Sequence, residues 1–255
     1  MHTEGLARWL GSWTDLKAIV AIEDPSSARW RRLRGEWRRS GTVGVLDVML
    51  FQAWYRMAWR RQDRDWHDRY VADLNRKYPA LDTGVQRLTV RSPNGPELRS
   101  LLERERPDFM LALCKHILKP EVFGVPRLGT FVMHPGVCPE YRNAHGCFWA
   151  LAAGDTGNVG MTLLQVDAGV DTGPVYGYFS YPYDEVNESH IQIQHRVVLD
   201  NLGAVQGRIQ DVASGAARPI ATAGRASRFW GQPRMSSYLA WRRRVGRTGH
   251  AHTRP

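Results

Sequence analysis

The chain has 255 residues, a hydrophobic content of 43% and a formal net charge of +10 at pH 7. This length fits one large α/β domain or a domain with an appendage, and no apolar run reaches the roughly 18 residues of a membrane-spanning helix. The N-terminal stretch lacks the features of a secretory signal, and the three cysteines favour reduced thiols. We therefore expect a cytoplasmic protein without a membrane span.

The positive charge is concentrated in two places. Ten arginines fall between Arg29 and Arg64, and the tail after Trp241 is also basic. Such a balance suits an anionic partner, for example nucleic acid, a phosphorylated cofactor, an acidic carrier protein or a membrane surface. A solvated basic face is the structural alternative.

Strand-like and helix-like segments alternate along the chain. Apolar, β-branched segments predict strands at residues 16–22, 85–90, 108–114, 129–134 and 160–167, with a further strand after the turn DAGVDTG. Helices are expected over the Arg- and Trp-rich stretch up to about Arg64, from the turn at 92–95 to near Pro107, in a short connector at 115–126, over 142–154 and as one long helix over 190–215. The last forty residues are poorly patterned.

Strands separated by helices of this length predict a mostly parallel, Rossmann-like sheet with a helical, partly irregular C-terminal extension. We place the α/β domain at 1–185 and the extension at 186–255. In parallel sheets, sites lie beyond the carboxyl ends of the strands. The loop HPGVCPEYRNAH follows one predicted strand and the DAGVDTG turn follows the next, so both loops are expected on the same rim.

The loop HPGVCPEYRNAH offers several chemistries. His134, Cys138, His145 and Cys147 match no common zinc spacing, so no metal is expected, and the cysteines suit packing better than catalysis. If the two strands are neighbours, Asp171 can face His134 as an acid–base pair, although for an isolated His and Asp a structural role is the more common explanation. No glycine-rich nucleotide-binding motif is present.

The segment from Pro107 to Tyr178 resembles the catalytic half of the folate-dependent formyltransferases, which include methionyl-tRNA, glycinamide ribonucleotide and sugar N-formyltransferases. Three stretches carry the resemblance: ALCKHILKPEVF, PRLGTFVMHPGVCPEYR and GMTLLQVDAGVDTG. The resemblance implies transfer of a formyl group from 10-formyltetrahydrofolate to an amine. It implies that His134 stabilises or protonates the oxyanion while Asp171 holds the imidazole and relays the amine proton. By position it assigns the folate pocket to His116, Ile117, Leu118, Val166, Asp167 and Gly169.

One position departs from the family pattern. The family has an asparagine two residues before the catalytic histidine, where this chain has Val132. Losing one such oxyanion donor typically costs about 2.7–4 kcal/mol. Asn143, His145 and Arg142 are candidate replacements. The alternatives are a non-catalytic relative that binds folate or a partner, and an acyltransferase that uses another donor such as a coenzyme A or acyl carrier thioester.

The segments before and after the region of resemblance indicate which acceptor to expect. The strand that precedes the family's first helix is missing before GLARWLGSW, and about seventy residues follow the catalytic half, too few for the C-terminal barrel of the tRNA-specific enzyme. We therefore expect a small-molecule or carrier-bound amine rather than tRNA.

The five tryptophans and nine arginines between Trp30 and Trp66 suit a membrane interface, an acidic carrier protein, or arginines stacked on tryptophans in an ordinary helical cover.

Overall fold

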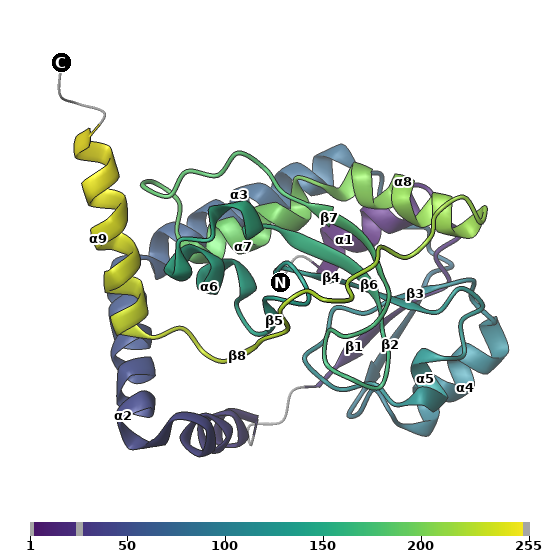
Figure 1. The fold of residues 1–255 in the computed structure, drawn as a ribbon. Coiled ribbons are helices and arrows are strands. Elements are labelled where there is room, and N and C mark those ends of the chain that lie inside the picture. The colour runs from purple at the N-terminus through teal and green to yellow at the C-terminus, as the bar shows by residue number, and fades with distance from the viewer. Residues whose placement is uncertain (1–2, 24–27, 252–255) are drawn as a thin grey trace.

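The computed structural model describes the backbone of residues 3–23 and 28–251, and their side chains except at residues 3, 28–34 and 248–251. Helices α1, α3, α7 and α8 gather along one side of the central strands (Figure 1). Helices α4 and α5 lie at one end of the molecule, and α2 and α9 lie at the other. The mixed α/β class expected from the sequence is confirmed.

The N-terminal half forms a two-stranded parallel sheet and three helices. Helix α1 (Thr3–Gly11) precedes β1 (Ala18–Ile22), which pairs in parallel with β2 (Gln86–Val90). Both strands lie where the sequence predicts them. Between them run α2 (Ala28–Ala58) and α3 (Arg60–Lys77), so the helical stretch extends beyond the expected end at Arg64. Gly41, with φ of +65°, divides α2 at a kink.

The central sheet has the strand order β3-β4-β6-β7. Strand β3 (Met110–Leu111) is parallel to β4 (Thr130–His134), whereas β6 (Met161–Gln165) runs antiparallel to β4 and to β7 (Val175–Phe179). The expectation that the loops after β4 and β6 leave from the same rim is therefore wrong. The segment 135–160 returns to the end of the sheet where β4 finishes, so His134 pairs with Thr162 at the start of β6.

Three helical expectations need correction or addition. Helix α6 (Gly146–Ala153) starts four residues later than predicted, because β5 (Arg142–Asn143) pairs with β8 (Phe229–Trp230). The long helix divides into α7 (His190–Leu199) and α8 (Leu202–Ala213), and Gly215, with φ of +76°, follows the end of α8. The tail, expected to be poorly patterned, contains α9 (Met235–Ala251). The short elements α4 (Pro96–Glu105), α5 (Pro120–Phe123) and the 3-10 helix η1 (Thr156–Asn158) complete the described chain.

Two main apolar clusters hold these elements together, and Cys138, Leu164 and Val175 form a third, minor one. The larger one joins α1, β4, α6, α7, α8 and α9 and contains the fully buried Trp9, Phe148 and Trp241. The smaller one lies under α4 and α5 and contains Leu98, Leu102 and Leu118. Because α7, α8 and α9 share the larger cluster with the central sheet, they fix the strands that present the candidate site. The domain boundary at 185 stays a prediction.

Candidate active site

His134 occupies the last position of β4 and is buried, with 5% of its surface exposed. Its Nε2 lies 2.8 Å from the carbonyl oxygen of Tyr141, and its Nδ1 lies 3.4 Å from Oδ2 of Asp171. A carbonyl oxygen can only accept, so Nε2 must donate its proton to Tyr141. A proton on Nδ1 as well would make the ring a cation facing the carboxylate. The structure thus brings together the two residues that the sequence paired.

Asp171 reaches His134 by a different route from the one expected. It lies in the loop between β6 and β7, whose base is closed by hydrogen bonds from Val166 N to Thr130 O at 2.7 Å and from Gln165 N to Pro174 O at 2.9 Å. Its carboxylate accepts a 2.7 Å hydrogen bond from the backbone amide of Asn143. The loop folds back along β4 instead of continuing past the strand end. The pair therefore forms even though β4 and β6 are antiparallel.

Backbone conformations at the site are unusual for side-chain-bearing residues. Asn143, His145 and Asp171 have φ values of 78°, 55° and 51°. Non-glycine residues in this left-handed region carry strain, typically about 1–3 kcal/mol each, and persist where surrounding contacts hold them. Apart from Arg106, they are the residues other than glycine with positive φ in the part of the chain described. Strain is thus concentrated around the His134–Asp171 pair.

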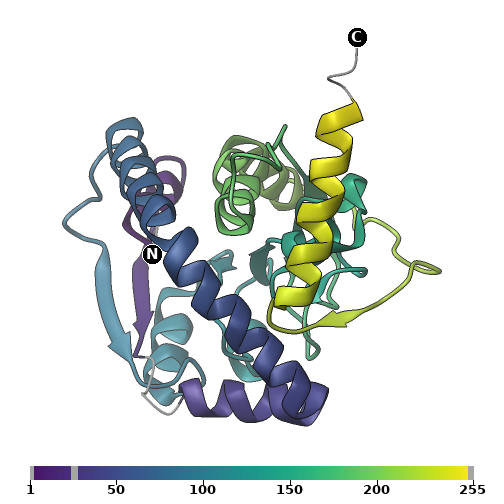
Figure 2. The same cartoon turned by 90° about the vertical axis from the view of Figure 1, so that its left-hand side faces the viewer.

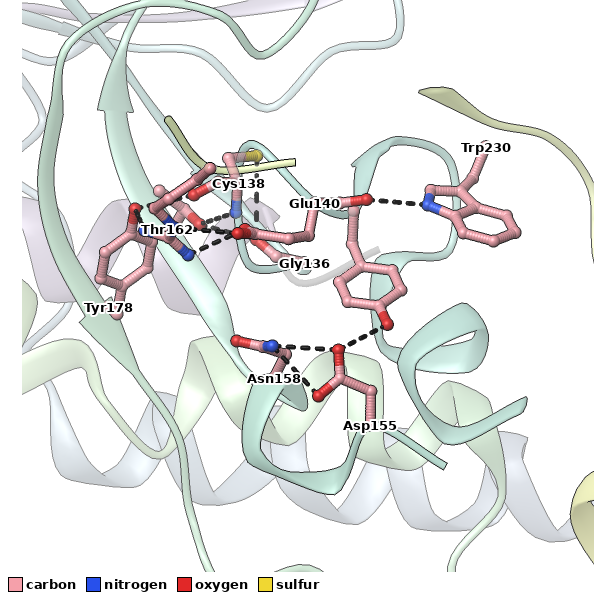
Figure 3. Close-up of polar contacts among 10 residues, drawn as sticks. Gly136, Cys138, Glu140, Asp155, Asn158, Thr162, Tyr178 and Trp230 are labelled. Carbon is pink, nitrogen blue, oxygen red and sulfur yellow. Dashed lines mark hydrogen bonds and ion pairs between the residues drawn. The ribbon is translucent and has the colours of Figure 1, made fainter. Parts of the chain in front are cut away.

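The loop after His134 is bound to strands β6 and β7 (Figure 3). The hydroxyl of Thr162 donates to Gly136 O at 2.7 Å and accepts from Cys138 N at 2.9 Å. The phenol of Tyr178 donates to Cys138 O at 2.7 Å. The loop also contains a cis peptide bond between Cys138 and Pro139. These bonds fix the backbone on which the Tyr141 carbonyl lies.

The C-terminal tail completes the same loop. Arg225 makes two hydrogen bonds of 2.8 Å to the carboxylate of Glu140. The indole of Trp230 donates to Glu140 O at 2.9 Å (Figure 3). The ring of Trp230 stacks on Trp149 with a centroid separation of 4.7 Å. On the other side of the loop, the phenol of Tyr141 donates to Asp155 at 2.8 Å. Residues far apart in sequence therefore hold the candidate site.

The expected folate connector lies between β3 and α5. Leu118 is buried in the smaller apolar cluster, whereas Ile117 has 66% of its surface exposed. Nδ1 of His116 is buried with no hydrogen-bond partner among the described residues. The side chain of Asn94 accepts from Lys119 N at 2.8 Å and donates to Ile117 O at 2.9 Å, which fixes the connector.

The second part of the expected folate pocket is the turn after β6. Oδ1 of Asp167 accepts hydrogen bonds from Gly169 N at 2.9 Å and from the hydroxyl of Thr172 at 2.7 Å. Val166 packs against the same small cluster that contains Leu118. The two stretches assigned to folate by resemblance therefore border one cluster.

The candidate oxyanion donors differ in their surroundings. Asn143 donates from its side chain to Trp230 O at 2.5 Å, and Arg142 donates to Val170 O at 3.2 Å. His145 instead lines a cavity of about 190 Å³ with Phe51, Gln52, Tyr55, Arg56, His190, Ile191, Gln232 and Pro233. Burial lowers the pKa of His145 to about 4, so its ring is neutral at pH 7. Val132, where the family pattern has an asparagine, pairs with Leu164 in the sheet.

The cysteines near the site are buried thiols. Burial raises the pKa of both Cys138 and Cys147 to about 12, so neither is a thiolate at neutral pH. Cys147 donates to Gly160 O at 3.3 Å. Among the described residues, no group of three or more His, Cys, Asp or Glu side chains is placed to hold a metal ion.

The match to known proteins supports the sequence resemblance. Residues 63–201 match the model of the family "Formyl transferase". This chain belongs to the formyltransferase family. The resemblance noted over Pro107–Tyr178 is confirmed, and the family match extends beyond it on both sides.

No helix in the described part of the chain is long and apolar enough to cross a membrane.

Several relatives and solved structures show the extent of the similarity. Methionyl-tRNA formyltransferases from Sorangium cellulosum and Chlorobium luteolum are 36% and 31% identical over 141 residues, which cover 52% and 55% of this chain. The chain spans only 45% and 44% of their lengths. A sugar N-formyltransferase structure from a Shewanella species matches with a TM-score of 0.46 and 12% identity, covering 83% of this chain and 76% of that one. Because the named relatives act on tRNA, the expectation against a tRNA acceptor loses support.

Several site residues were not singled out from the sequence. Gly136, Tyr141 and Thr162 position the His134 ring or its loop, Asn94 fixes the connector, and Trp230 holds the loop from the tail. Tyr141 acts through its backbone carbonyl, which no side-chain pattern reveals. Asn94 lies in the expected turn before α4, where Asn is common. Trp230 lies in the tail, which gave no pattern.

Proposed function

We propose that this chain transfers a formyl group from 10-formyltetrahydrofolate to an amine, with His134 and Asp171 as the acid–base pair. The observation that carries the proposal is the 3.4 Å separation between His134 Nδ1 and Asp171 Oδ2 inside a buried, hydrogen-bonded loop. Membership of the formyltransferase family supports the choice of reaction. The folate supplies the formyl group.

Each residue of the pair has a distinct part in the proposed reaction. Attack of the neutral amine on the formyl carbon places negative charge on the formyl oxygen, and His134 donates a proton or hydrogen bond to it from Nδ1. Nε2 stays bound to the Tyr141 carbonyl and fixes the ring plane. Asp171 stabilises the charged ring and accepts the proton that the amine releases. When the tetrahedral intermediate collapses, the bond between the formyl carbon and N10 of the folate breaks, His134 takes back the proton of the oxygen, and the proton from the amine passes to N10, so that tetrahydrofolate leaves. The amide of Asn143 keeps the carboxylate in place.

The folate pocket that we propose lies between the connector 116–118 and the turn 166–171. The unpaired Nδ1 of His116 and the exposed side chain of Ile117 would both gain a partner from a bound ligand. An unpaired buried polar atom is costly, so a ligand that supplies a hydrogen bond gains affinity. Leu118 and Val166 form the apolar floor.

The acceptor we propose is a small-molecule or carrier-bound amine, and methionyl-tRNA is the competing acceptor suggested by the names of the relatives. A panel of amino sugars, other small amines and methionyl-tRNA, assayed with 10-formyltetrahydrofolate, distinguishes them. Release of coenzyme A when an acyl-coenzyme A replaces the folate would instead support another donor. A chain that binds folate and transfers nothing to any amine would support the non-catalytic alternative.

The test of the pair is a double-mutant cycle on the active acceptor. His134→Ala and Asp171→Asn should each lower turnover by about 100- to 10,000-fold, which is the usual contribution of general acid–base catalysis. The double variant should be little worse than either single variant because the residues act as one unit. Multiplicative losses would show that the two residues act separately. Tetrahydrofolate binding should survive in all three variants.

A further inference from the structure

Large hydrophobic side chains are exposed along helix α2 to an unusual extent. Trp37, Val43, Leu46, Met49, Leu50 and Met57 each expose more than half of their surface. Val43, Leu46, Leu50 and Met57 follow one another at spacings of three, four and seven residues, which places them on one face of a helix. We call these four residues the outer stripe.

The outer stripe is a second apolar face of a helix whose inner face is already buried. Val48 and Phe51 are each 3% exposed. The rings of Phe51 and Trp54 contact Tyr238 of α9 with centroid separations of 5.6 and 4.3 Å. A helix that is apolar on both faces is normally covered on both. The outer stripe, about 20 Å long at 1.5 Å per residue, therefore lacks a partner in the described structure.

Helices α2 and α3 cross one whole face of the molecule with no other element in front of them (Figure 2). The outer stripe therefore lies on a helix that packs against α9 on one side and that no other described element covers on the face in view. A single amphipathic helix can place its exposed apolar face in the interface of a bilayer. The exposure of the stripe along one helix therefore suits a lipid surface.

Positive charge continues from the end of the stripe. Arg56, Arg60, Arg61 and Arg64 surround a hollow of about 450 Å³ that also contains Asp65. Arg60, Arg61 and Arg64 form no hydrogen bond or ion pair with another described side chain. Asp63, the nearby carboxylate on the same helix, is buried and bonded to Tyr55 and Ser189. The exposed surface is therefore apolar along the outer stripe of α2 and cationic at the start of α3.

This charge disfavours a second copy of the chain as the covering partner. Two copies packed stripe to stripe in parallel would bring their Arg60–Arg64 segments together. Like charges would then lie side by side, which is repulsive. An anionic bilayer accommodates both the apolar stripe and the arginines that follow it.

We propose that α2 and α3 dock on the surface of a bilayer that contains anionic phospholipid, with the outer stripe in the interface and the arginines on the headgroups. The docking helix borders the candidate active site, because Phe51, Tyr55 and Arg56 line the same cavity as His145. The inference concerns a surface outside the His134–Asp171 pair and does not depend on formyl transfer.

The test is co-sedimentation of the full chain with vesicles of phosphatidylglycerol and phosphatidylcholine, and with vesicles of phosphatidylcholine alone. The chain should bind the mixed vesicles and bind the neutral ones at least ten times more weakly. Each arginine near an anionic bilayer contributes about fivefold to binding, so R60Q/R61Q/R64Q should bind about 100-fold more weakly. R99Q/R104Q/R127Q makes the same change in net charge around α4 and α5, at the far end of the molecule, and should bind like the parent (Figure 1).

The apolar part is tested by Leu50→Glu against Val186→Glu, since the two side chains are 61% and 56% exposed. Leu50→Glu should remove vesicle binding, and Val186→Glu should leave it unchanged; both variants should melt like the parent. Equal binding to neutral vesicles, or binding unaffected by the arginine triple change, would overturn the proposal. So would absence of vesicle binding together with a dimer in sedimentation that Leu50→Glu dissociates, because a second copy would then cover the stripe.

Discussion

Nε2 of His134 lies 2.8 Å from the carbonyl oxygen of Tyr141, seven residues further along the same loop. This contact fixes which ring nitrogen carries a proton in the neutral form, and it directs Nδ1 towards Asp171. The loop can close on itself in this way because Gly136 lies between the two groups. A Cβ at Gly136 would lie 2.7 Å from His134 Nε2 and 2.5 Å from Tyr141 O.

Gly136→Ala should therefore displace the imidazole. A misplacement of about 1 Å can cost about 100-fold in rate, so we expect a loss of that order in kcat with folate binding retained. Gly157→Ala is the control, since a Cβ there meets nothing within 4 Å. Equal kcat values for both alanine variants would show that the Tyr141 contact does not orient a catalytic ring.

The missing asparagine leads to a second prediction. Val132 and His134 are two residues apart in a strand and so share a face, and valine offers no donor there. If the side chain of Asn143 supplies the missing hydrogen bond to the oxyanion, Asn143→Gly should lower kcat by about 100- to 1,000-fold with little effect on KM. Glycine suits the left-handed backbone at this position and keeps the amide that binds Asp171.

The companion variants separate the candidate donors. Val132→Asn should raise turnover if a donor is missing from this face. His145→Ala should leave turnover nearly unchanged if its ring serves only the cavity beside α2. Turnover that is insensitive at both Asn143 and His145, together with a soluble but inactive Val132→Asn, would show that neither side chain replaces the family's asparagine.

Thr162 should contribute strongly to stability. Its hydroxyl is fully buried and bonds both Gly136 O and Cys138 N. Thr162→Val leaves both backbone groups without that partner, at about 1–3 kcal/mol for each unpaired group. We expect the free energy of unfolding, measured by urea titration, to fall by about 2–4 kcal/mol. The exposed Thr172, changed to Val, should lose less than 1 kcal/mol; equal losses would mean that the buried hydroxyl is not required.

The buried histidines predict acid sensitivity. Burial lowers the pKa of His145 to about 4 and the pKa of His190 well below its usual value, while an unfolded histidine titrates near 6.5. The unfolded chain therefore takes up these protons first as the pH falls. The stability contributed by the neutral rings is complete above pH about 6.5 and decreases below it by about 1.4 kcal/mol per pH unit for each ring. In urea titrations between about pH 4 and 6.5, His190→Gln should reduce the loss of unfolding free energy by about 1.4 kcal/mol per pH unit. An unchanged pH dependence would show that His190 is not a buried neutral ring.

The cysteines give the last prediction. Because burial raises the pKa of Cys138 and Cys147 to about 12, iodoacetamide should label neither of them in the folded protein at neutral pH. Both should be labelled once urea unfolds the chain, as judged by peptide mass spectrometry. Cys138→Ser and Cys147→Ser should retain most of the turnover. Rapid labelling of either residue in the folded state would revive the nucleophile that the sequence left as a minor alternative.

Strands and loops in the catalytic half were largely predictable because their signals are local. The buried strand 130–134, the turn DAGVDTG and the glycine after α8 lie where pattern and composition place them. The pairing direction of β6 was not predictable, because both directions bury the same apolar residues. The division of the long helix at Asn201 depends on its side chain, which bonds Ser180 O and Val197 O.

The sequence allowed the two candidate catalytic residues to be predicted, but not the groups that hold them in place. His134 and Asp171 are identified by the family motifs, and their contact is present in the structure. The groups that hold them are backbone atoms, such as the Tyr141 carbonyl and the Asn143 amide, or residues of the tail. Helix α9 lacked an obvious pattern because its apolar positions are few. Trp241, which is 1% exposed, and Tyr238 nevertheless anchor it in the core.

The parallel pairing of Arg142–Asn143 with Phe229–Trp230 affects the order in which a new chain can complete its site. His134 and Asp171 leave the ribosome before Trp230, whereas a domain generally folds as a unit. Until the tail arrives, the carbonyl of Glu140 has no indole donor and the side-chain amide of Asn143 has no acceptor in Trp230. A shortened chain that stops at residue 201, where the family match ends, would contain both catalytic candidates on an unfinished loop. Completion of the site therefore waits for the segment around Trp230.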